Sequence, residues 1–278
     1  MSAALTKLTH THARLGTLLS IGLEPTPQYL PPGFSPTLQD YERFLRGIVD
    51  ATAGLACAYK LNVAFFEALG AEGWALMEML RAALPRDVLV IADGKFCDIG
   101  SSAERYAEAI YARLDADAAT VNPLMGRDSI DAWLDHTDRL TFFLVLTSNP
   151  GASDFLLVDG LYRRLGRQLV EWACARRAQS CLGFVVGATR PDRMGEVRKI
   201  GPDVPFLVPG LGAQGGSLAE TVAAGRSAAV FPGLLFHMTR GILAGPEEEG
   251  DPFEIVRRKA QRWRDAINAA VAESRHAP

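Results

Sequence analysis

The chain has 278 residues, of which 48% are hydrophobic and 22% charged, with a formal net charge of -3 and a pI near 6.0. This balance is typical of a globular protein with a sizeable core and argues against a disordered chain. The slight acidity gives no bulk electrostatic basis for binding nucleic acid or an anionic membrane, so neither is expected as a partner.

The N-terminal segment MSAALTKLTHTHARLG is expected to be a polar tail that carries His10 and His12. It holds no apolar run long enough for a signal peptide, and no stretch of about 18 apolar residues occurs later, which predicts a cytoplasmic protein. No long linker divides the chain, so residues 1–278 are expected to form one domain, in the manner of barrels of about 250 residues.

Short apolar runs bounded by turn residues alternate along the chain with longer amphipathic segments. The runs are nearly continuous in apolar residues, as expected for parallel strands that are covered on both faces. The predicted strands are 17–23, 56–61, 88–93, 118–122, 141–147, 182–187, 205–210 and 233–238. Helical periodicity occurs between them at 42–54, 71–84, 102–114, 161–178 and 190–200.

Eight strands with intervening helices predict an α/β fold, a closed TIM (β/α)8 barrel, because no GxGxxG turn follows the first strand. The proline-rich stretch 25–37 is expected to be an ordered but irregular loop, and 244–253 a solvated turn before the last helix. Four cysteines show no CxxC or Cys/His ligand spacing, which predicts reduced thiols and no structural zinc.

Two lysines and two aspartates follow the ends of the second and third predicted strands. Lys60 ends the second strand, and Asp93, Lys95 and Asp98 follow the run VLVIA of the third. Reactive groups in such barrels collect at the carboxyl ends of the strands, and the period of two along a strand places Asp93 and Lys95 on one side. An isolated DxKxxD is usually a solvated loop, but its position beside Lys60 favours a functional cluster.

The segment DGKFCDIGSSAERYAEA resembles the signature of the orotidine 5'-monophosphate decarboxylase family, in which a DxKxxDI segment supplies catalytic residues. AYKLNVAFFEALG is similar to the family's KxNxAFFEALG block. Further blocks resemble the bacterial subgroup with longer loops: VNPLMGRDSI, LTSNPGASDF, GFVVGATRPDRMGEVRKIGPDVPFLVPGLGAQGG and GLLFHMTRGIL. They run in family order from residue 18 to about 245.

The resemblance implies a charged array of Lys60, Asp93, Lys95 and Asp98, with Asp98 reaching into the site of a second copy in a homodimer. Lys95 would protonate C6 of orotidine 5'-monophosphate as carbon dioxide leaves, which gives UMP and completes pyrimidine biosynthesis without metal or cofactor. The enzyme must then stabilise the negative charge that develops at C6 more than it stabilises the bound carboxylate.

The resemblance also implies substrate-binding residues outside this array. Gln214 and Arg240 would hold the phosphate, the usual arrangement after strands seven and eight of a barrel. Ser148 would contact the pyrimidine edge, and Ser102 the ribose of the neighbouring site. The other candidates are Glu24, Asn62 and Thr239.

Each of these residues has a purely structural alternative. A turn position is the alternative for Gln214, a surface position for Arg240, and helix capping for Ser148 and Ser102. Asn62, like Asn122, ends a strand and is expected to support neighbouring loops. His237 lies in the last predicted strand, where a core or loop role is expected.

Several positions depart from the family pattern and leave the substrate open. Glu24 stands where the family has an aspartate that binds a ribose hydroxyl, and Phe96 and Cys97 replace an Arg-Gly pair. Leu124 replaces a tyrosine and Thr239 a serine. The charged groups beside Cys97 favour a lowered thiol pKa, but a bystander role is expected for this residue.

Three alternatives to the uridylate-forming decarboxylase therefore stay open. The first is a divergent family member that acts on a modified nucleotide. The second is a related barrel that acts on another phosphorylated substrate with magnesium. The third is a non-catalytic paralogue that binds nucleotides.

Overall fold

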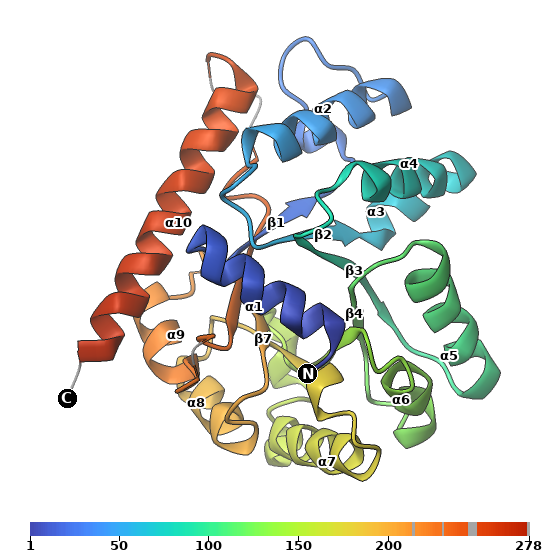
Figure 1. The fold of residues 1–278 in the computed structure, drawn as a ribbon, viewed down its shortest axis with the longest axis vertical. Coiled ribbons are helices and arrows are strands. Elements are labelled where there is room, and N and C mark those ends of the chain that lie inside the picture. The colour runs from blue at the N-terminus through green and yellow to red at the C-terminus, as the bar shows by residue number, and fades with distance from the viewer. Residues whose placement is uncertain (213–214, 230, 244–248, 277–278) are drawn as a thin grey trace.

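Eight parallel strands close into a barrel in chain order, with β1 hydrogen-bonded to β8 (Figure 1). The computed structural model describes residues 1–212, 215–229, 231–243 and 249–276. The strands are β1 Leu19–Leu23, β2 Ala58–Asn62, β3 Leu89–Phe96, β4 Ala118–Val121, β5 Leu140–Leu146, β6 Leu182–Val186, β7 Phe206–Val208 and β8 Leu234–Met238. All eight predicted strands and the predicted TIM-barrel class are confirmed.

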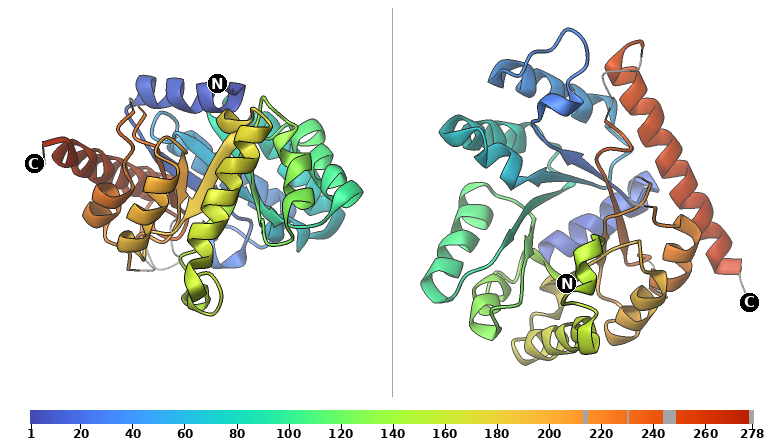
Figure 2. Two further views of the ribbon diagram at one scale, coloured as in Figure 1. Left: turned by 90° about the horizontal axis from the view of Figure 1, so that it is seen from below. Right: turned by 180° about the vertical axis from the view of Figure 1, so that it is seen from behind.

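Helices surround this barrel as an outer ring, as the views in Figure 1 and Figure 2 show. Every segment predicted to be helical contains one, although 102–114 changes from an α-helix to a π-helix at Glu108. The proline-rich loop 25–37 is ordered and irregular, as predicted, with a single 3-10 turn at Pro27–Tyr29. Residues 244–248 of the predicted solvated turn lie outside the described residues.

The α-helices are α1 Ala3–Leu15, α2 Leu38–Ala51, α3 Val63–Glu67, α4 Gly70–Ala83, α5 Gly100–Ala107, α6 Arg127–Leu134, α7 Leu161–Ala175, α8 Pro191–Ile200, α9 Leu218–Gly225 and α10 Pro252–His276. The π-helix Glu108–Arg113 continues α5, and further 3-10 turns lie at Pro150–Ser153, Val158–Gly160 and Gln179–Cys181. Throughout the described ranges, every helix is too short or too polar to cross a bilayer.

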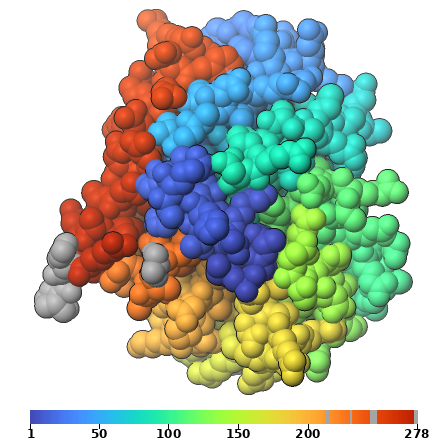
Figure 3. Space-filling model, in the orientation of Figure 1, coloured from blue at the N-terminus to red at the C-terminus, as the bar shows by residue number. Residues whose placement is uncertain are grey.

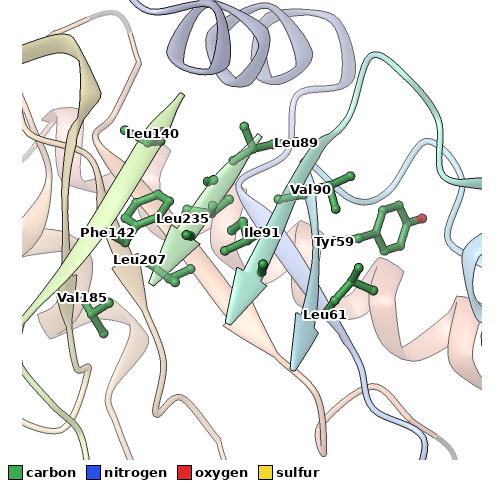
Figure 4. Close-up of a cluster of buried hydrophobic side chains, with 14 of the residues drawn as sticks. Tyr59, Leu61, Leu89, Val90, Ile91, Leu140, Phe142, Val185, Leu207 and Leu235 are labelled. Atoms are coloured by element: carbon green, nitrogen blue, oxygen red, sulfur yellow. The ribbon is translucent and has the colours of Figure 1, made fainter. Parts of the chain in front are cut away.

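Side chains alternate along each strand between the barrel interior and the helical layer. Figure 4 shows Tyr59 and Val90 on one side of β2 and β3, while Ile91 points to the other side, toward Leu207 and Leu235. The Tyr59 hydroxyl reaches the carbonyl of Val49 in α2 at 3.2 Å, which identifies its side as the helical one. The next residues in the alternation, Lys60 and Asp93, therefore face the interior at the carboxyl ends of their strands.

Residues 3–15 form helix α1, so the prediction of a polar tail is wrong. Ser2 caps the helix by accepting a hydrogen bond from the Leu5 N–H at 3.2 Å, and Gly16 ends it in the left-handed conformation. Leu8 is fully buried, and Lys7 pairs with Asp117, which directly precedes β4, at 2.5 Å. Figure 3 shows α1, in dark blue, across the middle of one face of the molecule, and its contact with Asp117 identifies this face as the one at the amino ends of the strands.

Candidate active site

The Asp93 carboxylate is the centre of a buried ionic cluster at the carboxyl ends of β2, β3 and β4. Lys60 donates to its Oδ2 atom, while Lys95 and Thr120 donate to Oδ1 at 2.8 and 2.7 Å. The side chains of Lys60 and Asp93 are only 4% and 9% exposed, whereas that of Lys95 is 54% exposed. Three of the four predicted array residues therefore meet in the order Lys60, Asp93, Lys95.

The ionised form of Asp93 is strongly favoured in this cluster. Burial alone would raise the pKa of its carboxyl, but the charges of Lys60 and Lys95 and their hydrogen bonds outweigh burial and hold the pKa well below its ordinary range. A negative charge therefore stays fixed between two ammonium groups across the whole physiological pH range.

An irregular strand end, rather than simple alternation, brings Lys95 to Asp93. Ala92 pairs with Ala119 on β4, and Phe96 pairs with Val121. Between these two pairs β3 advances by four residues while β4 advances by only two. Lys95 has a positive φ of 49°, and its N–H donates to the Thr120 hydroxyl at 3.0 Å. Asp93 and Lys95 therefore lie together through a bulge, which the simple alternation of side chains along a strand does not include.

Phe96, which departs from the family pattern, packs against the surrounding helices rather than against the ionic cluster. Its ring is stacked on Trp133 at 5.4 Å and contacts Tyr106 at 5.3 Å, and the residue is 8% exposed. A Cβ atom at Gly94 would lie only 2.3 Å from this ring. Glycine at position 94 therefore gives Phe96 the space to anchor β3 against α5 and α6.

Asp98 does not join the other three array residues within the described part of the chain. Its Oδ1 atom accepts a hydrogen bond from the Ile99 N–H at 2.8 Å, and the side chain is half-buried. In the neighbouring residue, Cys97, burial raises the pKa of the thiol despite a hydrogen bond from the Met125 backbone. The lowered thiol pKa considered for Cys97 is therefore wrong. All four cysteines are free, as predicted.

A cavity of about 280 Å³ opens beside the cluster and is lined by five of the predicted residues: Glu24, Lys60, Asn62, Thr239 and Arg240. Asn62 donates to Glu24 at 3.2 Å, which gives it the supporting contact expected of it. Arg240 is exposed and has no hydrogen bond or ion pair within the described residues. Tyr29 also lines the cavity, and burial, followed by the charge of Glu24, raises its pKa.

The remaining predicted residues lie outside this cavity. Ser102 is exposed in the first turn of α5, whose N-cap is Ile99, so the helix-capping alternative is wrong for Ser102. Ser148 follows β5 and is not a cap either, because Asn149 precedes the next 3-10 turn. Gln214 lies outside the described residues.

Sequence reasoning missed two cavity-side residues and underrated a third. Thr120 bridges Asp93 and the Lys95 backbone, and Tyr29 comes from a loop that looked merely irregular. His237, expected to have a core or loop role, lines the cavity and has hydrogen bonds at both ring nitrogens. The available signal was a single polar residue inside an apolar strand, as Thr120 and His237 are.

Known proteins of the same length and architecture resemble this chain. The profile of a family described as orotidine 5'-phosphate decarboxylase / HUMPS matches residues 18–250. A protein named orotidine 5'-phosphate decarboxylase from Roseiflexus sp. (strain RS-1) is 42% identical over 266 residues, which cover 94% of this chain and 96% of that protein. A protein of the same name from Azoarcus sp. (strain BH72) is 44% identical over 260 residues, or 91% and 94% of the two chains.

Among solved structures, OMP decarboxylase from Leishmania donovani superposes with a TM-score of 0.81 at 32% identity. The match covers 98% of this chain and 99% of that one. Sequence, fold and the signature residues agree along nearly the whole length. The chain belongs to the orotidine 5'-phosphate decarboxylase family, as the sequence motifs predict, and is an enzyme of its carbon–carbon lyase class.

Proposed function

We propose that this enzyme decarboxylates orotidine 5'-monophosphate to UMP in pyrimidine biosynthesis, without a metal or cofactor. The observation that carries the proposal is the buried Asp93 carboxylate between the ammonium groups of Lys60 and Lys95. The names of the curated relatives support the same reaction.

In the proposed reaction, the bond between C6 and the carboxylate carbon breaks, and its electron pair stays on C6 while carbon dioxide leaves. Lys95 then gives a proton from Nζ to C6 and regains one from solvent. Lys95 suits this role because its side chain, which is 54% exposed, is the most accessible of the three. Its charge is poised where negative charge develops, so it stabilises the transition state more than the ground state.

Asp93 has two proposed tasks in this step. Its permanent negative charge holds the Lys95 ammonium group at 2.8 Å, which fixes the proposed proton donor in the site. The same charge disfavours a substrate carboxylate placed beside it, an interaction that disappears when carbon dioxide departs.

Arg240 and Glu24 are proposed to hold the two polar parts of the nucleotide. Arg240 has a guanidinium group available at the cavity rim and would bind the phosphate, with Gln214 as a second contact. Glu24, which is only 7% exposed at the cavity wall, would accept a hydrogen bond from a ribose hydroxyl. Ser148 and Ser102 are proposed to contact the pyrimidine and the ribose of the neighbouring site.

The site is proposed to be completed by a second copy of the chain that donates Asp98. Apolar side chains are exposed around Asp98: Ile99 is 49% exposed, Leu124 53% and Met125 49%. Large exposed apolar residues gathered at one rim are typical of a protein interface. A twofold dimer would cover them and bring each Asp98 to the opposite site.

Decarboxylation is favoured over the reaction of a magnesium-dependent barrel. Among the described residues, no three His, Cys, Asp or Glu side chains gather as a metal-binding group. The test is carbon dioxide release from orotidine 5'-monophosphate, followed by the loss of substrate absorbance, with and without EDTA. Turnover unaffected by EDTA supports the proposal, whereas strong inhibition supports the magnesium reaction.

Lys95→Ala tests the role of the proton donor. A missing stabilising donor costs about two to three powers of ten in rate, and the loss of the proton source is expected to cost more. An unaltered rate would exclude the mechanism. Nucleotide binding by the wild type without any turnover would instead favour a non-catalytic binding protein, measured as a ligand-dependent rise in Tm.

Complementation between two inactive variants tests the shared site. Lys95→Ala and Asp98→Ala are coexpressed, and a mixed dimer then holds one site in which both residues are intact. Random pairing restores about a quarter of the wild-type activity if the sites are shared by twofold symmetry. Activity that stays at the level of the separate variants shows that Asp98 serves its own chain.

A further inference from the structure

A chain of side-chain hydrogen bonds runs from the barrel interior to the Glu24 carboxylate. The Ser20 hydroxyl lies 3.2 Å from Nδ1 of His237, and Nε2 of His237 lies 3.2 Å from the Thr239 hydroxyl. The Thr239 hydroxyl in turn donates to Oε1 of Glu24 at 3.3 Å. Three of these residues, Glu24, His237 and Thr239, line the cavity beside the ionic cluster.

The direction of each bond follows from the number of protons available. A threonine hydroxyl has one proton, and Thr239 uses it on a carboxylate oxygen that can only accept. The contact with His237 must then run from the ring Nε2–H to the Thr239 oxygen. Nδ1 carries no proton in that tautomer, so it accepts from the Ser20 hydroxyl.

The surroundings of His237 keep this tautomer neutral. Burial lowers the pKa of its imidazole well below the ordinary value, and the charges of Lys60 and Lys95 lower it further, against the opposing charge of Asp93. A protonated ring would carry a proton on both nitrogens, so Nδ1 would no longer accept from Ser20. The ordered chain of bonds is therefore stable over the physiological pH range.

The same contacts leave one oxygen of Glu24 available. Oε1 accepts from both Asn62, at 3.2 Å, and Thr239. Among the described residues Oε2 has no hydrogen-bond partner, although the carboxylate is almost fully buried at the cavity wall. An accessible carboxylate oxygen with free acceptor capacity, on a residue that is otherwise almost fully buried, is a recognition element for a ligand hydroxyl.

Close packing holds the Thr239 end of the chain in place. A Cβ atom at Gly22 would lie 2.0 Å from the Thr239 hydroxyl oxygen and 3.1 Å from Cε1 of His237. The Thr239 side chain thus occupies the space that a larger residue in β1 would fill. Its hydroxyl has little freedom to turn away from Glu24.

We propose that His237 is a positioning residue for sugar recognition, which acts through Thr239 to hold Glu24 with Oε2 directed at a ribose hydroxyl of the nucleotide. This inference rests on the proposed function for the identity of the ligand. It assigns to His237 and Ser20 a part in selecting a ribonucleotide over a nucleotide that lacks that hydroxyl.

The test compares the binding of UMP with that of its 2'-deoxy and 3'-deoxy counterparts by calorimetry. Loss of a hydrogen bond to a charged group lowers affinity by about tenfold or more, so the wild type is expected to prefer UMP over one deoxy form by that factor. His237→Asn retains a polar group near Nδ1 but none near Nε2, and its preference is expected to fall within about threefold of unity. His237→Gln places an amide N–H near Nε2 and is expected to retain the preference.

A merely structural role for His237 would weaken all three nucleotides equally and leave the ratios unchanged, which would overturn the inference. Long-range 1H–15N correlation spectra of the wild type supply a second readout, and a proton on Nδ1 would also overturn it. A wild type that prefers UMP but releases no carbon dioxide from orotidine 5'-monophosphate would refute the proposed reaction and leave the positioning role standing. Absence of nucleotide binding would refute both.

Discussion

Replacing Asp93 by asparagine separates the structural and chemical effects of the charge at the centre of the site. The substitution removes the only carboxylate that contacts Lys60 among the described residues, and the Lys60 side chain is 4% exposed. Removing one partner of a buried ion pair typically costs about 3–5 kcal/mol, because the other charge stays buried and uncompensated. The open cavity beside Asp93 favours the lower end, and we expect Asp93→Asn to lower the free energy of unfolding by about 3 kcal/mol.

Asp98→Asn is the matched control, since Asp98 lies five residues further along and contacts only the Ile99 backbone. Both variants are expected to lose activity, but Asp98→Asn is expected to change stability by no more than about 0.5 kcal/mol. Urea denaturation followed by tryptophan fluorescence measures the difference at neutral pH. Equal stability of the two variants would refute the assignment of Asp93 as a buried counter-ion.

The pH dependence of this difference has a definite sign. The folded-state pKa of Asp93 is lowered, so its stabilisation is fully present above the unfolded-state pKa of about 3.9 and is lost as the pH falls through the folded-state value. The stability gap between the wild type and Asp93→Asn is therefore expected to be constant from neutral pH down to about pH 5 and to narrow in stronger acid. A gap that widens in acid would contradict the lowered pKa.

Three further substitutions test other parts of the structure. Arg240→Ala is expected to raise KM by about tenfold or more through loss of a charged phosphate contact, while kcat changes less, and initial-rate kinetics that show an unchanged KM would disprove that contact. Gly94→Ala places a Cβ atom 2.3 Å from the Phe96 ring and is expected to destabilise the fold by about 1–3 kcal/mol; urea midpoints should show a smaller loss for it in a Phe96→Leu background. Leu8→Ala empties a fully buried position in α1 and is expected to cost about 2–5 kcal/mol without changing kcat of the folded enzyme, a result that a large drop in kcat would contradict.

The barrel could be predicted from the sequence because its strands are nearly continuous apolar runs with turn residues at both ends. Helix α1 was missed because three threonines and two histidines interrupt its apolar pattern, and only Ala4, Leu8 and Thr11 are buried. The signals that identify it are the capping Ser2 and the terminal Gly16, which bracket that weak apolar stripe.

The candidate site was predicted in part. Lys60, Asp93 and Lys95 meet because barrel strands bring their carboxyl ends together, which a strand pattern can predict. The positive φ of Lys95 and the outward turn of Phe96 depend on the bulge and on space at Gly94, and neither follows from local propensity. The role of His237 depends on contacts with Ser20, 217 residues away in sequence, and only the closed barrel creates that contact.

Helix α1 has a consequence for the order in which the chain matures. It precedes every strand along the chain, yet it docks against residues just ahead of strands much later in the sequence. The hydroxyl of its cap, Ser2, donates to the Ser180 carbonyl at 2.7 Å, and the Ala4 N–H donates to the Asp138 carbonyl at 2.9 Å. Domains form during synthesis as their parts emerge from the ribosome, so the bond between Ser2 and Ser180 can form only after the first five strands have been made, whereas the pair of Lys7 with Asp117 can form earlier. The docking of α1 is thus completed late in folding, once most strands of the barrel exist.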